Sequence, residues 1–132
     1  MAKPKFKLTN YDKSLVDRIH QVDHQTVGVW ALICAKHVLH FYTDTYPQDQ
    51  RPQDALAALQ KWIETGEFSM RVIRRAALDA HAAAREVGED NPARSAARSA
   101  GQAVSTSHVR THAIAAAGYA LQAIHRAASD AD

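Results

Sequence analysis

The chain has 132 residues, 46% of them hydrophobic, with sixteen Lys or Arg against fourteen Asp or Glu. A single domain of this length can bury one core without disulfides, and a lone cysteine, Cys34, excludes an internal disulfide in any case. The formal net charge of +2 is too small to indicate a nucleic-acid-binding protein.

The N-terminal segment MAKPKFKLTNYDK contains lysines without a following apolar region, which does not match a secretory signal. We expect residues 1–8 to form a flexible N-terminal tail and residues 9–132 to form a single helical domain. The most apolar stretch, VGVWALICA at 27–35, is about half as long as a membrane span. The sequence therefore predicts a cytoplasmic protein of bacterial type that does not enter a membrane.

The first half of the chain predicts three helices. Thr9 or Asn10 can cap a short first helix, and Asp23 can cap a second helix that runs to about Thr43. The second helix is apolar nearly all round, so we expect it in the middle of the bundle. Pro52 suits the first turn of a third helix.

Glycine and capping residues also predict where the third, fourth and fifth helices begin and end. Gly66 is expected to end the third helix, and Ser69 to cap a fourth that ends just before Gly88. Asn91, followed by proline, predicts the start of a fifth helix by the same logic.

From Pro92 to about Ala128 neither a proline nor a glycine pair interrupts the helical pattern. One helix of that length would be about 55 Å long, whereas a compact chain of this size has a radius of gyration of about 14 Å. We therefore expect a break at SerThrSer, residues 105–107, with Thr106 or Ser107 capping a sixth helix.

The pattern as a whole predicts an all-α fold, a compact bundle of five or six helices. Nineteen alanines lie between positions 76 and 128, so the C-terminal half should be closely packed, with helix axes near the short end of the usual range. The larger residues expected in the core are Trp30, Cys34, Phe41, Trp62 and Ile73. The buried stripe expected on the last helix is Ile114, Ala117, Leu121, Ile124 and Ala128.

A polar cluster is expected opposite that stripe, from His108, His112 and Tyr119, with His81 joining from the fourth helix. Histidines at i and i+4 can chelate a metal, which makes His81, His108 and His112 a candidate metal set. The segment HVRTH lacks the internal glutamate of a zinc hydrolase. We favour a cluster with structural or partner-contact duties, and expect no cofactor, no catalytic residues and no enzymatic activity.

A basic surface is predicted on the fourth and fifth helices. Residues 71–126 carry eight arginines against four acidic residues, whereas residues 1–70 are balanced. Such a face can be simply solvated or can contact an acidic partner or an anion. The residues are Arg71, Arg74, Arg75, Arg85, Arg94 and Arg98. Aromatic residues do not interleave with them, which argues against single-stranded nucleic acid.

The segments RPQDALAALQKWIETGEFSMRVIRRAALDAHAAAREV and NPARSAARSAGQAVSTSHVRTHAIAAAGYAL resemble small all-helical immunity proteins of bacterial toxin systems. VWALICAKHVLHF fits the tryptophan-and-cysteine helix of these proteins, so the likeness covers most of residues 23–124. Its marks are the AHAAAR and HVxTHA segments, here His81, Arg85, His108 and His112. The resemblance implies an all-α bundle that neutralises a cognate toxin by binding it.

The sequence leaves three hypotheses of function. The first is an immunity protein that occludes a toxin by stoichiometric binding. The second is a nucleic-acid-binding helical module that uses the arginine face, with binding that falls steeply as salt is added. The third is a metal-dependent enzyme built on the three histidines. Whether the alanine-rich helices also form a homo-oligomer is left open by the sequence.

Overall fold

The computed structural model describes residues 13–130 of the chain. The expected tail at 1–8 and the expected caps Thr9 and Asn10 lie outside these residues. The helices are α1 (Lys13–Gln21), α2 (His24–Val38), α3 (His40–Thr43), α4 (Arg51–Thr65), α5 (Met70–Glu86), α6 (Pro92–Ser105) and α7 (His112–Asp130). Over residues 13–130 the regular structure is entirely helical, which confirms the all-α class. None of these helices has both the length and the apolar character needed to cross a membrane.

The predicted helix starts at Asp23, Ser69 and Asn91 are confirmed, because each side chain caps a helix. Asp23 Oδ2 accepts a hydrogen bond from Thr26 N at 3.1 Å, and Ser69 Oγ accepts one from Val72 N at 3.3 Å. Asn91 Oδ1 accepts from the backbone N of the third residue of α6 at 2.9 Å. Each bond satisfies a backbone donor that has no partner within the helix itself.

The expected ends of the third and fourth predicted helices are also confirmed. Gly66 follows α4 with a φ of 72°, and Gly88 lies just past α5 with a φ of 84°. Both are left-handed conformations that glycine adopts without the steric cost of a side chain.

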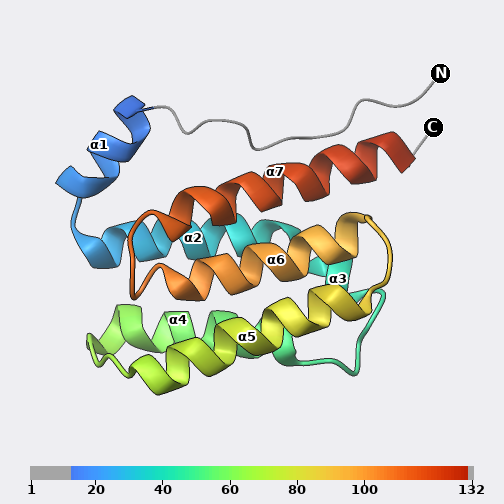
Figure 1. Cartoon of the computed structure of the whole chain (residues 1–132), viewed down its shortest axis with the longest axis horizontal. Helices are drawn as coiled ribbons and strands as arrows, with labels where there is room; N and C mark the ends of the chain where they lie inside the picture. The colour runs from blue at the N-terminus through green and yellow to red at the C-terminus, as the bar shows by residue number, and fades with distance from the viewer. Residues whose placement is uncertain (1–12, 131–132) are drawn as a thin grey trace.

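The helices form two layers, shown in Figure 1, with α5, α6 and α7 side by side in one and α2 and α4 behind them. α6 lies at the centre and packs against α2, α3, α4, α5 and α7. The expectation that the apolar second helix would occupy the middle was wrong. One side of α2 faces outward, where Val29, Trp30 and Ile33 are 36–61% exposed.

Small side chains explain why α6 can be central. Its buried residues are Ala93, Ser95, Ala96, Ala97, Ser99, Ala100, Gly101, Ala103 and Val104. Such residues let neighbouring helix axes approach closely on several sides. Ser99 Oγ donates to the backbone oxygen of Ala116 in α7 at 2.8 Å, a contact that requires the two helices to be close.

The face of α7 that turns inward differs from the predicted stripe. Its buried side chains are mainly alanines: Ala113, Ala116, Ala120 and Ala123. Ile114 is buried as expected, but Leu121 is 58% exposed and Ile124 is 41% exposed. Ala117 is half-buried and Ala128 is exposed. The close approach of α6 leaves room only for small side chains, so the larger ones lie outside.

Of the large residues expected in the core, some are buried and others are not. Trp62 and Ile73 are buried, at 7% and 4% exposure, as predicted. Cys34 and Phe41 are only half-buried. Trp30 was placed wrongly, since it is 36% exposed beside the groove between α1 and α2.

The break expected near residues 105–107 is present, but its cap is not where it was predicted. Thr106 and Ser107 are buried in the turn that ends α6, and α7 begins only at His112. Two long-range bonds hold this turn. His24 Nε2 lies 2.6 Å from the backbone oxygen of Thr106, and Arg110 Nη1 donates to that of Val22 at 2.5 Å.

The close packing of α6 and α7 predicts a size-dependent response to substitution. Ala116 is fully buried, so Ala116→Leu should lower the free energy of unfolding by roughly 1–3 kcal/mol through overpacking. Ala128→Leu, on the exposed side of the same helix, should change it by less than about 0.5 kcal/mol. Urea unfolding followed by far-UV circular dichroism measures both, and equal effects would contradict the proposed packing.

Candidate functional site

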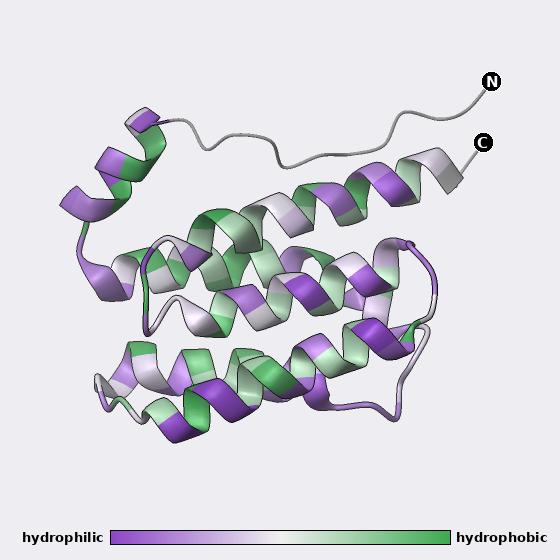
Figure 2. Ribbon diagram, viewed as in Figure 1, coloured by the Kyte–Doolittle hydropathy of each residue, from purple (hydrophilic) through white to green (hydrophobic). Residues whose placement is uncertain are grey.

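The outward side of α5 carries charged and apolar side chains together. Its inner side is the buried row Ile73, Ala80, Ala83 and Ala84. Because the helical repeat is 3.6 residues, the side chains on the opposite side of α5 from this row point away from α4 and α6. Arg71, Arg74 and Arg75 are exposed there, and Leu78 is 55% exposed among them. Figure 2 shows the resulting alternation of hydrophilic and hydrophobic segments along this helix.

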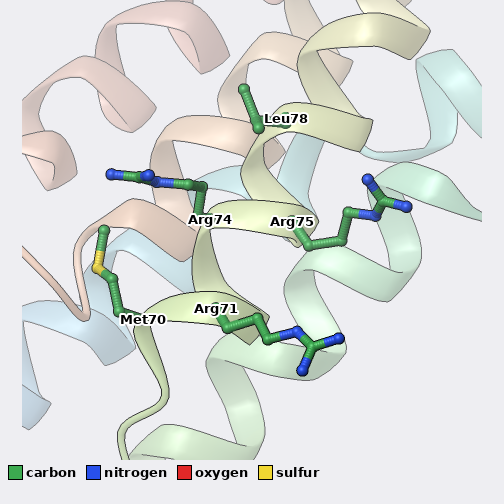
Figure 3. A pocket seen from close by; sticks show the side chains of 5 residues that line it. All are labelled: Met70, Arg71, Arg74, Arg75 and Leu78. Carbon is green, nitrogen blue, oxygen red and sulfur yellow. The ribbon is translucent and has the colours of Figure 1, made fainter.

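Met70, Arg71, Arg74, Arg75 and Leu78 line an open hollow, and we call these five residues the α5 face. In Figure 3, Arg74 extends to one side of the helix together with Met70, and Arg71 and Arg75 extend to the other. Met70, Arg74 and Leu78 therefore form one row along α5, with the arginine between the two apolar side chains, and Arg71 and Arg75 form a neighbouring row. A binding partner would meet positive charge and apolar surface side by side in the hollow.

The positive charges of the α5 face are poorly compensated within the fold. Arg75 Nε lies 3.8 Å from Asp79 Oδ2, and both side chains are largely exposed, so this pair contributes little. Arg71, Arg74 and the exposed Arg85 form no ion pair with any acidic residue in the described part of the chain. A local positive field results, although the chain as a whole is nearly neutral.

The six arginines predicted as one surface do not form one. Arg94 is held by the protein, because its Nε donates to the backbone oxygen of Ala84 at 3.1 Å and its Nη1 pairs with Asp90 at 2.9 Å. Arg98 Nη1 donates to Nδ1 of His81 at 2.9 Å. These two side chains join α6 to α5, whereas Arg71, Arg74, Arg75 and Arg85 remain exposed.

His81 lies between α5 and α6, against Gly101. A methyl group at Gly101 would come within 2.7 Å of the imidazole Cε1 and Nε2, so glycine makes room for the ring. Since arginine can only donate, the Nδ1 that accepts from Arg98 must be unprotonated. Burial, and then the positive charges of Arg98, Arg85 and His112, lower the pKa of His81 from 6.5 to about 4. His81 is therefore a neutral hydrogen-bond acceptor at neutral pH.

The other members of the predicted polar cluster have separate partners. His112 Nδ1 lies 2.7 Å from Gln102 Oε1, and burial, then the charge of His108, lowers the pKa of His112. His108 is exposed in the turn before α7, with its ring stacked at 6.0 Å from that of Phe68. Tyr119 is half-buried further along α7. No three metal-ligating side chains among residues 13–130 are grouped to hold an ion, so His81, His108 and His112 do not form that set.

A further polar network was not identified from the sequence. Tyr42 donates to Asp49 Oδ2 at 2.5 Å, and Arg51 binds the same carboxylate through Nε and Nη2 and also pairs with Glu86 of α5. The Arg51 guanidinium holds the pKa of Asp49 well below its usual range, and burial together with Asp49 raises the pKa of Tyr42. The network fastens the turn between α3 and α4 to α5. Sequence spacing suggests the Asp49–Arg51 pair but not its distant partners.

The lowered pKa of His81 predicts that stability depends on pH. Between pH 6.5 and about 4, His81 is protonated in the unfolded chain but stays neutral in the folded protein. The free energy of unfolding should therefore fall as the pH falls. We expect a loss of roughly 1–2 kcal/mol from this partly exposed group, with a contribution of the same sign from His112. Urea midpoints at about pH 4.5 and 7.0 measure the loss.

His81→Gln should weaken this dependence, because an amide oxygen can accept from Arg98 but does not titrate in this range. The exposed His37 provides the matched control, His37→Gln. If both variants keep the pH dependence of the wild type, His81 is not its source.

Comparison with known proteins supports the likeness described from the sequence. The family model described as "Imm-5 like putative immunity protein" matches residues 17–132, which is most of the chain. No curated protein and no solved structure matches the chain. The all-helical bundle seen here agrees with the fold that the resemblance implied. The match includes α5, α6 and α7 in full, and the chain belongs to the Imm-5 like immunity protein family.

Proposed function

We propose that this protein is an immunity protein that neutralises a bacterial toxin by stoichiometric binding in the cytoplasm, without turnover. Membership of the immunity-protein family supports the toxin as partner. The observation that carries the binding mode is the α5 face, where arginines with little or no acidic compensation lie beside exposed apolar atoms. Charged groups that stay exposed set partner choice and association rate, and a few apolar anchors supply much of the affinity.

The alternative of a metal-dependent enzyme receives less support from the geometry. His81 and His112 each use Nδ1 in a hydrogen bond to α6, with Arg98 and Gln102 respectively. Neither of these hydrogen bonds joins the ring to a nucleophile, and His108 is stacked on Phe68. Hydrogen-bonded, neutral histidines of this kind suit helix-to-helix contacts better than proton transfer.

Neutralisation of a toxin predicts a defined stoichiometry. We expect a toxin gene beside this gene, and its product should lose activity in proportion to added protein, with the titration reaching its end point near one to one. Isothermal titration calorimetry should give the same ratio, and deletion of the gene should sensitise cells to that toxin. The proposal would be refuted if a catalytic amount of this protein inactivated the toxin. It would also be refuted if the wild-type protein did not inhibit the toxin at all.

A further inference from the structure

The arginines of the α5 face lie where they oppose helix formation. The N-cap is Ser69, so Arg71 lies in the first turn of α5, and that turn contains no acidic residue. Positive charge near a helix N-terminus interacts unfavourably with the helix dipole. Arg71 also lies three and four residues from Arg74 and Arg75, spacings at which like charges repel. Folding therefore does not explain this arrangement, and departures of this kind are typical of functional surfaces.

The apolar part of the same surface indicates which kind of partner it fits. Leu78 is 55% exposed and shares the hollow with Met70. Methionine and arginine are both enriched in protein–protein interfaces relative to the rest of the protein surface. Interfaces with nucleic acid are more polar, and single strands are bound by aromatic side chains that stack on the bases. The side chains lining this hollow include no aromatic residue.

We propose that the α5 face docks an acidic segment of the toxin, and this inference rests on the proposed function. Carboxylates of that segment pair with Arg71, Arg74 and Arg75, which can each form two parallel hydrogen bonds to a carboxylate. A large apolar side chain of the same segment lies against Met70 and Leu78. Binding removes the repulsion among the arginines, so the groups that destabilise the free protein stabilise the complex.

The test separates binding from folding with two double variants of equal charge change. Arg71→Glu/Arg74→Glu reverses two arginines of the α5 face that have no acidic partner among the described residues, and Arg18→Glu/Lys36→Glu reverses two exposed basic residues on α1 and α2. Arg18 and Lys36 lie in the last turns of their helices, where positive charge is favourable. The two variants should therefore change stability in opposite directions.

For Arg71→Glu/Arg74→Glu we expect the melting temperature to rise by about 1–4 °C, because a carboxylate in place of the Arg71 guanidinium would favour the helix dipole and pair with Arg75. Affinity for the toxin encoded beside the gene should fall at least roughly tenfold, mainly through slower association, with a weaker dependence on salt. For Arg18→Glu/Lys36→Glu we expect toxin binding close to that of the wild type and no rise in melting temperature. Leu78→Ser should accelerate dissociation while the protein stays folded.

Surface plasmon resonance at low and high salt, about 50 and 300 mM NaCl, distinguishes the outcomes, with a single-stranded oligothymidylate as a second probe. Wild-type affinity of Arg71→Glu/Arg74→Glu for the toxin would overturn the docking site and leave the proposed function intact. Failure of the wild type to inhibit the toxin would instead overturn the proposed function. Loss of oligothymidylate binding in that variant, with toxin binding unchanged, would assign the α5 face to nucleic acid. A lower melting temperature would show that the arginines serve folding.

Discussion

The close approach of neighbouring helices to α6 is the constraint on which the rest of the structure depends. Alanine, serine and glycine line α6, and the bond from Ser99 to the backbone of Ala116 holds α7 against it. Gly101 admits the ring of His81 from the other side. A longer side chain at any of these positions would push a neighbour outward, and interiors packed at this density relax only partly around such a change. Helix order and spacing therefore follow from side-chain size along one central helix.

One consequence is that large apolar residues remain outside. Leu121 and Ile124 of α7 and Ile33 of α2 are more than 40% exposed, because the space around α6 accepts alanine instead. Exposure of a leucine is common in this fold and by itself says little about binding. The α5 face differs from these other apolar positions in its surroundings. There the exposed leucine lies beside arginines with little or no acidic compensation, and the packing around α6 requires neither feature.

Structural features that depend on residues close in the sequence, such as helix caps, could be predicted. Features that depend on how two helices pack against each other could not. The caps at Asp23, Ser69 and Asn91 act within three residues, so their patterns could be read directly. The inward face of α7 could not be predicted in this way. Its hydrophobicity pattern favoured burial of Leu121, whereas the close approach of α6 leaves room only for alanine. The exposed arginines followed from helical periodicity. That Arg98 would instead be bound by His81 depended on how α5 and α6 pack.

On α5, the side chains that pack the fold and those of the proposed docking surface lie on opposite sides of the helix. Its inner alanines pack against the neighbouring helices, whereas Arg71 in its first turn opposes the helix dipole and repels Arg74 and Arg75. Substitutions on the outer face should thus alter partner choice with little effect on the fold, since isolated surface changes usually shift stability by less than about 0.5 kcal/mol. If the proposed function holds, this arrangement suits a protein that must recognise one particular toxin. The proposed docking surface on α5 can change sign or shape while the small-residue core, which tolerates little change, stays the same.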